Sequence, residues 1–221
     1  AALHNLGCKV NAYETEAMQH LLEEAGYEIV PFTQKADVYV INTCSVTNMA
    51  DRKSRQMLHK AKKNNPDSIV VAAGCYVQTS EKEVLNDLSV DIVIGNDRKH
   101  DLVRLLEEYS LDSVNDTVDD INDGKHDFEE LFIDQTKEHT RAFIKVQDGC
   151  NQFCSYCIIP YARGRVRSRR FENVIAEVER LAANGFKEVV LTGIHLSSYG
   201  VDFEEATGLL ELIQAGGAGK E

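Results

Sequence analysis

Residues 37–44 of the chain read DVYVINTC, a short apolar run that ends in a cysteine. Apolar runs of roughly four to eight residues, separated by helical patterns, are typical of buried strands in a parallel sheet. Strands are expected at 3–6, 37–42, 69–73 and 91–94, and helices near 13–25, 47–63, 80–88 and 99–109. The first helix is expected to be opened by Asn11 and stopped by Gly26. This alternation predicts an α/β domain in which helices flank a doubly wound parallel sheet.

The chain beyond residue 140 repeats the alternation. Strands are expected at 141–147 and 188–192, and helices near 171–183 and 203–214. Two strand–helix units form the opening of a barrel or of another doubly wound sheet. Because two units cannot close a barrel, the chain is expected to be part of a longer protein.

An acidic stretch separates the two halves. With 221 residues, 43% of them hydrophobic, the chain is long enough for one large or two ordinary domains. Residues 112–138 hold ten acids against two lysines and show no sustained period, which is typical of a linker or a solvated hairpin. We therefore predict an N-terminal domain at 1–110, an acidic linker at 111–139 and the start of a second, truncated domain at 140–221.

The charge of the chain is unevenly distributed. A formal net charge of −12 argues against a protein that binds nucleic acid by bulk charge alone. Between residues 139 and 170 the balance reverses, with seven basic side chains against one acid. Arginine forks suit phosphate groups, so four residues are candidates for RNA contacts: Arg163, Arg165, Arg167 and Arg169. Alternatively, some of these arginines pair with the acidic linker or are simply solvated.

Nothing in the sequence predicts a membrane or secreted protein. No apolar run approaches the roughly 20 residues that cross a bilayer, and the first residues lack the layout of a secretory signal. The chain is therefore expected to be cytoplasmic. Disulfides are rare in that compartment, so the six cysteines are expected to be either buried apolar residues or ligands.

Three of the cysteines lie within eight residues of one another. Cys150, Cys154 and Cys157 follow the strand expected at 141–147, and Gly149 gives the backbone freedom there. Such crowding of thiolates favours an iron–sulfur cluster, and three ligands leave one iron of a four-iron cluster open to another molecule. The alternatives are a zinc knuckle or three buried thiols. Zinc sites usually pair one CxxC with a second pair or a nearby histidine, which this stretch lacks.

The other three cysteines are far apart in the sequence but share a position. Cys8, Cys44 and Cys75 each come directly after an expected strand. Because the carboxyl ends of parallel strands meet at one edge of a sheet, we expect the three thiols to share one site. Gly7 and Gly74 would let the backbone approach a bulky cofactor. The alternative is three buried cysteines that bind nothing.

Five stretches together resemble a known family. They are LGCKVNAYETE (6–16), INTCSVTNMADRKSRQ (41–56), AAGCYVQ (72–78), GCNQFCSYCIIPYARGRVRSR (149–169) and VVLTGIHLSSYG (189–200). Together they resemble the radical S-adenosylmethionine methylthiotransferases, over nearly all of residues 3–200 apart from the acidic linker. The motifs LGCKVN and LTGIH are most similar to those of the branch that acts on N6-threonylcarbamoyladenosine in tRNA.

The resemblance implies an enzyme with two [4Fe–4S] clusters. The first would be held by Cys150, Cys154 and Cys157, with S-adenosylmethionine on its open iron, where one electron releases a deoxyadenosyl radical. The second would be held by Cys8, Cys44 and Cys75, which follow the first three strands. This second cluster would deliver or carry the sulfur. The fold implied is an N-terminal α/β domain followed by the beginning of a (β/α) partial barrel.

The resemblance also implies a substrate and contacts to it. Threonylcarbamoyladenosine at position 37 of tRNA would become its 2-methylthio derivative, with electrons from a donor such as a flavodoxin or ferredoxin, and with no DNA or membrane as partner. Tyr156 would lie near the adenine of S-adenosylmethionine, or merely pack in its loop. Thr192 and Gly193 would meet the methionine amine. The remaining barrel strands and C-terminal RNA-binding domain of the family are absent, which leaves the activity of the isolated chain open.

Three other functions stay open at this point. A sibling enzyme would act on isopentenyladenosine in tRNA or on an aspartate of a ribosomal protein. A non-catalytic electron carrier with two clusters would normally saturate every iron, and a site with three cysteines argues against that. A zinc-dependent RNA-binding module would contain zinc and no sulfide.

Overall fold

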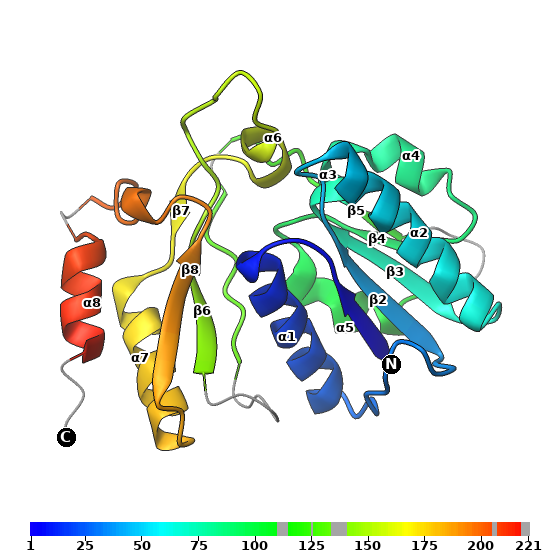
Figure 1. Cartoon of the computed structure of the whole chain (residues 1–221), viewed down its shortest axis with the longest axis horizontal. Coiled ribbons are helices and arrows are strands. Elements are labelled where there is room, and N and C mark those ends of the chain that lie inside the picture. Colours follow the sequence, from blue (N-terminus) through cyan, green and yellow to red (C-terminus); the bar gives the residue numbers. More distant parts are fainter. Residues whose placement is uncertain (110–114, 125, 134–140, 205–206, 218–221) are drawn as a thin grey trace.

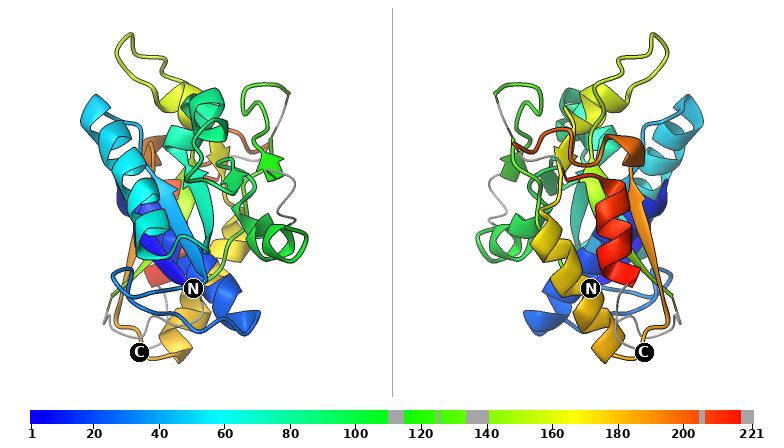
Figure 2. Two further views of the ribbon diagram at one scale, coloured as in Figure 1. Left: turned by 90° about the vertical axis from the view of Figure 1, so that its right-hand side faces the viewer. Right: turned by 90° about the vertical axis from the view of Figure 1, so that its left-hand side faces the viewer.

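The computed structural model describes residues 1–109, 115–124, 126–133, 141–204 and 207–217. The chain forms two α/β units that lie side by side, one around a five-stranded sheet and one around a three-stranded sheet (Figure 1). The loop at 149–158 projects from the body of the molecule, and it lies at the top of the side views as well (Figure 2).

The first unit is built on a parallel sheet. Its strands are β1 (Ala2–Asn5), β2 (Val38–Thr43), β3 (Ile69–Gly74), β4 (Ile92–Ile94) and β5 (Asn115–Thr117), in the spatial order β1-β2-β3-β4-β5. The four strands that were predicted are confirmed. Strand β2 is buried along its whole length, as expected for a central parallel strand with both faces covered.

Helices cover both faces of this sheet. They are α1 (Lys9–Glu24), α2 (Asn48–Asn64), α3 (Cys75–Thr79), α4 (Glu81–Leu85), the 3-10 turn η1 (Lys99–Asp101) and α5 (Leu102–Glu107). On one face Met18 of α1 and Leu102 of α5 share a core, and on the other Leu58 of α2 packs with Tyr76 of α3. The prediction of a doubly wound α/β unit is therefore confirmed.

Helix α1 begins earlier than the sequence predicts. Cys8 stands at its N-cap, and Asn11 lies inside the first turn. The Asn11 side chain does not cap the helix, because its Nδ2 donates to the carbonyls of Leu6 at 2.8 Å and Thr43 at 2.9 Å. Asn11 thereby ties the first turn of α1 to the ends of β1 and β2.

The acidic stretch is not the solvated linker that its composition predicts. Residues 115–117 form β5 and extend the first sheet by one strand, so the predicted boundary at residue 110 is wrong there. Ile121, Leu131 and Ile133 are buried. Single apolar residues among acids give no periodic signal, although each of them fills a core position. Within the predicted linker, residues 111–114, 125 and 134–139 lie outside the described residues.

The second unit begins with a strand–helix–strand arrangement. Its elements are β6 (Arg141–Asp148), α6 (Ile159–Arg163), β7 (Arg167–Ser168), α7 (Phe171–Ala183), β8 (Glu188–Gly193), the 3-10 turn η2 (Leu196–Ser198) and α8 (Leu209–Gly217). Strand β6 pairs in parallel with β8 and antiparallel with β7. Helices α7 and α8 pack on β6 through Val174, Leu181 and Leu212. The predicted second strand–helix alternation is confirmed, although α8 begins later than residue 203.

Helix α1 lies between the two units, in contact with β1 and β2 on one side and with β6 and β8 on the other. The Tyr13 hydroxyl donates to the Leu131 carbonyl at 2.5 Å, which fastens α1 to the acidic stretch. Among the described residues, no helix has the length and apolar character needed to cross a bilayer.

Candidate functional site

The first three cysteines stand at the carboxyl ends of β1, β2 and β3. Cys44 and Cys75 are buried, Cys8 is exposed, and all three are free thiols. A Cβ on Gly7 would come within 3.0 Å of Cys44 Sγ, so the backbone beside Cys8 lies against Cys44. The structure thus brings the three residues to one edge of the sheet, where the sequence places them.

The same cysteines are electrostatically coupled. Burial raises the pKa of the Cys44 thiol, charges on Cys75 and Cys8 raise it further, and the Arg163 guanidinium acts in the opposite direction. The side-chain amide of Asn96 lies 3.6 Å from Cys75 Sγ. We refer to Cys8, Cys44 and Cys75 as the N-terminal triplet.

Gly74 serves packing instead of the approach of a cofactor. Its φ is +96°, and an added Cβ would lie 2.4 Å from Asn42 Oδ1 and 2.7 Å from the Thr43 carbonyl oxygen. The space beside Gly74, where the sequence predicts a cofactor, is filled by atoms of β2. Glycine is therefore required by the backbone conformation and by the neighbouring strand.

The other three cysteines lie in the projecting loop between β6 and α6, and we call them the loop triplet. Cys154 is exposed, whereas Cys150 and Cys157 are half-buried. The Cys150 amide donates to the Gly164 carbonyl at 3.0 Å, and the Cys157 amide donates to the Cys154 carbonyl at 2.9 Å. These bonds fix the base of the loop and its last turn.

Two backbone positions in this loop are unusual. Phe153 has a φ of 47°, in the left-handed region that non-glycine residues rarely occupy. Gly149 has a φ of +68°, and a Cβ there would come 1.8 Å from the Arg165 carbonyl oxygen. The crossing of these two chain segments therefore needs a glycine at 149.

The donor sets fit iron–sulfur clusters. Each triplet supplies three thiols, which is the number of protein ligands of a four-iron cluster with one iron open to another molecule. In the part of the chain that the structure describes, no three His, Cys, Asp or Glu residues are grouped so as to hold a single metal ion. Cluster thiolates bind separate irons, so they need not converge on one point.

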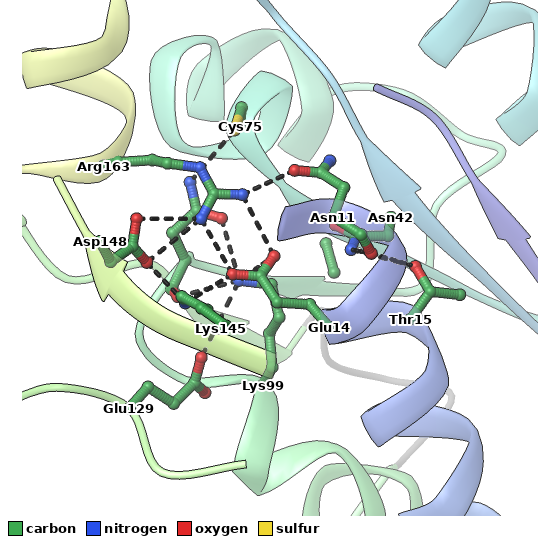
Figure 3. A network of polar contacts seen from close by, with 12 residues as sticks. Asn11, Glu14, Thr15, Asn42, Cys75, Lys99, Glu129, Lys145, Asp148 and Arg163 are labelled. Carbon is green, nitrogen blue, oxygen red and sulfur yellow. Dashed lines mark hydrogen bonds and ion pairs between the residues drawn. The ribbon is translucent and has the colours of Figure 1, made fainter. Parts of the chain in front are cut away.

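A network of buried ions lies beside Cys75 of the N-terminal triplet (Figure 3). Glu14 of α1 accepts from Lys145 Nζ at 2.7 Å and from Arg163 Nη1 at 2.9 Å, and its second oxygen lies 3.4 Å from Lys99 Nζ. Burial alone would raise the pKa of Glu14, but the charges of Arg163, Lys145 and Lys99 hold it well below its usual range. Sequence reasoning missed this network, because its members come from distant parts of the chain.

Asp148 joins the network to the loop triplet. It lies 2.6 Å from Lys145 and 3.1 Å from Arg163, and its Oδ1 accepts from the Gly149 amide at 2.8 Å. Burial raises its pKa, but the charges of Arg163 and Lys145 outweigh that effect and lower it. The last residue of β6 therefore stays ionised beside the cysteine loop.

Two protein-family models match the chain. The uncharacterized protein family UPF0004 covers residues 1–95, and the radical SAM superfamily covers residues 144–218. The chain is 47% identical over 206 residues to the threonylcarbamoyladenosine tRNA methylthiotransferase MtaB of Bacillus subtilis, covering 92% of this chain and 45% of that protein. It is 45% identical over 220 residues to MtaB of Aquifex aeolicus, covering 98% of this chain and 53% of the relative.

The chain therefore carries a UPF0004 region followed by a radical SAM region, and over most of its length it is similar to tRNA methylthiotransferases. A tRNA-2-methylthio-N(6)-dimethylallyladenosine synthase of Thermoanaerobacter is 36% identical over 211 residues, with 92% of this chain and 44% of the relative covered. The chain spans about half the length of the curated relatives it matches.

A solved structure shares the fold. The radical S-adenosylmethionine methyltransferase TsrM of Kitasatospora setae, with tryptophan and an S-adenosylmethionine analogue bound, superposes with a TM-score of 0.56. The match has 16% sequence identity and covers 89% of this chain and 48% of TsrM. The fold of this chain therefore recurs in a radical SAM enzyme of low sequence identity.

Three of the four arginines proposed to bind RNA are not available to it. Arg163 and Arg169 are fully buried and Arg167 is 5% exposed. Arg163 pairs with Glu14 and Asp148, and Arg167 Nη2 lies 3.7 Å from Asp148. For these arginines the prediction of phosphate contacts is wrong, because their guanidinium groups are buried away from the surface.

Arg169 pairs with the acidic stretch, as the alternative interpretation predicts for part of this run. Its Nε donates to Glu130 Oε2 at 2.8 Å, and Nη1 pairs with Glu177 of α7. Arg165 alone of the four is exposed. Its guanidinium lies 4.3 Å from the ring centroid of Phe153, beside the loop triplet.

The remaining site predictions fall at the same end of the second unit. Tyr156 is 91% exposed in the cysteine loop. Thr192 is buried at the end of β8, and a Cβ on Gly193 would come within 3.0 Å of Gln147. The His195 amide donates to Gln147 Oε1 at 2.6 Å, so Gln147 links the ends of β6 and β8.

Proposed function

We propose that this chain is the cofactor-binding half of a tRNA methylthiotransferase that converts N6-threonylcarbamoyladenosine at position 37 to its 2-methylthio derivative. The observation that carries the proposal is the pair of cysteine triplets on adjoining units, joined through one buried ion network. Higher identity to the MtaB relatives than to the dimethylallyladenosine synthase favours this substrate over isopentenyladenosine.

Each triplet is proposed to hold one [4Fe–4S] cluster, with S-adenosylmethionine at the loop triplet. When bound there, cluster and S-adenosylmethionine would supply, with one electron from an external donor, the radical chemistry that activates C2 of the adenine ring. The residues of the chain would orient the cofactors and exclude water from them. Gly149 lets the loop cross Arg165, and the Cys150 amide bond to Gly164 holds the first thiol at the end of β6.

The other proposed contacts lie around the cysteine loop. Tyr156 would face the adenine of S-adenosylmethionine, and Thr192 and Gly193 its methionine amine. Arg165 would contact tRNA phosphates, since it is the exposed member of the four candidate arginines. The partners proposed are tRNA and an electron donor such as a flavodoxin or ferredoxin, in the cytoplasm.

Nucleoside analysis of tRNA tests the substrate. A strain that lacks the gene should lose 2-methylthio-threonylcarbamoyladenosine, and the full-length gene should restore it, whereas a Cys154→Ala version should not. The isopentenyladenosine derivative serves as the internal control and should stay unchanged. Normal levels of the threonylcarbamoyl derivative in the deletion strain would refute the assignment, and loss of the isopentenyl derivative would favour the sibling activity.

Iron and sulfide assays after anaerobic purification test the cofactors. Replacing either triplet by alanine should remove about half of the iron and half of the sulfide. A colourless protein that contains zinc would refute the proposal. Adding S-adenosylmethionine to the reduced protein should alter its electron paramagnetic resonance spectrum and release 5′-deoxyadenosine, whereas an unchanged spectrum without that product would favour an electron carrier.

A further inference from the structure

Arg163 stands between the two cysteine triplets, and Asn11 connects it to the N-terminal one. Arg163 Nη2 donates to Asn11 Oδ1 at 2.6 Å. The Asn11 amide in turn donates to the carbonyls of Leu6 and Thr43, the second of which directly precedes Cys44. One planar guanidinium is therefore fixed relative to the segments that carry two cysteines of the triplet (Figure 3).

A second connection runs from α6 to Cys75. Asn96 Nδ2 donates to the carbonyl of Ala162, the residue before Arg163, at 2.6 Å and also lies 3.6 Å from Cys75 Sγ. Lys99 Nζ donates to Asn96 Oδ1 at 2.9 Å and so orients this amide. Burial would lower the pKa of Arg163, but the charges of Asp148 and Cys75 raise it well above its usual value.

The buried charges of the network do not balance. All of its ionic side chains are less than a tenth exposed, and they comprise four cations and three carboxylates: Lys99, Lys145, Arg163 and Arg167 against Glu14, Glu129 and Asp148. An unmatched charge in a protein interior is costly unless a partner of opposite sign is near. Besides Asp148 and Glu14, Arg163 faces Cys75. The thiolates of the N-terminal triplet, when they bind a cluster, would supply the missing negative charge beside Arg163.

We propose that Arg163 is a positioning residue that places the surplus positive charge of the network beside the N-terminal triplet. This charge raises the reduction potential of the cluster held there. This inference rests on the proposed function, because it needs a cluster at Cys8, Cys44 and Cys75. Reduction adds one negative charge to a cluster, so a fixed cation nearby favours the reduced form. Charges outside the ligand set are known to tune metal centres in this way.

The test uses the full-length chain with the loop triplet replaced by alanine, so that only the N-terminal cluster assembles. Its potential is measured by anaerobic titration with dithionite, followed by electron paramagnetic resonance. Arg163→Met should lower the ratio of reduced to oxidised cluster at a fixed potential by about tenfold, which is about 59 mV for one electron. Arg163→Lys keeps the charge and should change the ratio by less than about threefold. Arg104→Met, which removes an exposed arginine of α5, should leave it unchanged.

Glu14→Gln gives a test with the opposite sign. This change removes a carboxylate, adds to the surplus of positive charge and should raise the ratio by at least about threefold. A purely structural role of the network would lower iron content in both variants, but it would not shift the potential in opposite directions.

The outcomes separate the inference from the proposed function. An unchanged potential in Arg163→Met, or a lower one in Glu14→Gln, would overturn the inference. If the Arg163→Met variant takes up no iron, the Glu14→Gln variant decides the question: a higher potential supports the inference, and an unchanged or lower potential overturns it. If the chain with Arg163 intact takes up no iron at the N-terminal triplet, the proposed second cluster is wrong, and the inference is overturned with it.

Discussion

Replacing Arg169 by methionine tests whether this arginine supports the fold or binds RNA. Arg169 and Glu177 are both fully buried and form an ion pair, and Arg169 also pairs with Glu130 at 2.8 Å. Methionine keeps an unbranched apolar stem in the same space. The main consequence is therefore that Glu177 loses its cation.

The protonation of Glu177 gives the magnitude. Burial raises the pKa of this carboxyl, and Arg169 opposes the rise. Without Arg169 we expect Glu177 to be neutral in the folded protein, whereas in the unfolded chain it ionises with a pKa of about 4.3. Each pH unit above that value costs about 1.4 kcal/mol, which sets upper limits of about 3.7 kcal/mol at pH 7 and about 1.6 kcal/mol near pH 5.5, because part of this cost is already present when Arg169 is in place. The first figure agrees with the roughly 3–5 kcal/mol lost when one partner of a buried pair is removed.

Urea-induced unfolding, followed by circular dichroism at both pH values, measures the difference in free energy of unfolding. Arg104→Met is the control, because Arg104 forms its ion pairs with Asp101 and Glu108 at the surface, and it should cost less than about 1 kcal/mol. If Arg169→Met also costs less than about 1 kcal/mol at pH 7, or if its cost fails to shrink near pH 5.5, the structural role is refuted.

Two more predictions concern the cysteine loop and the acidic stretch. Gly149→Ala places a Cβ against the Arg165 carbonyl and should remove the iron bound by the loop triplet while the N-terminal triplet keeps its own, as measured by iron assay; equal loss at both would contradict the argument. The hydrogen bond that the His100 ring donates to Glu129 raises the pKa of His100, so this contact stabilises the fold below the unfolded value of about 6.5, and its contribution is lost as the pH rises through the folded value. The free energies of unfolding of the wild type and of His100→Gln should therefore converge as the pH rises from about 6 to about 8.5.

The strands that position the N-terminal triplet could be predicted because a parallel strand covered on both faces is a continuous apolar run. The same geometry brings Cys8, Cys44 and Cys75 to one edge, since every strand of such a sheet ends on the same side. Strands β5 and β7 could not be predicted, because two or three residues are too few to carry a period.

The ion network could not be predicted from local patterns. Arg163 and Glu14 are 149 residues apart in the sequence, and Lys145 and Glu14 are 131 apart. The one local signal is Lys145, a charged residue inside the apolar strand AFIKVQ, because a buried lysine needs a carboxylate partner. That signal indicates that a partner exists without saying which acid it is.

The acidic stretch and the arginine run look like separate surfaces along the sequence, but in the fold they are partners. Glu130 pairs with Arg169, and Glu129 lies 3.9 Å from Lys99. Acids of the stretch are therefore paired with basic side chains inside the fold, and neither adds its full charge to the surface. A count of arginines therefore overestimates the basic surface of this half of the protein. The proposed RNA contacts of this run are therefore restricted to the arginines that stay exposed, Arg165 and Arg170. Exchanging a buried arginine of the run would act through the stability and orientation of the two units.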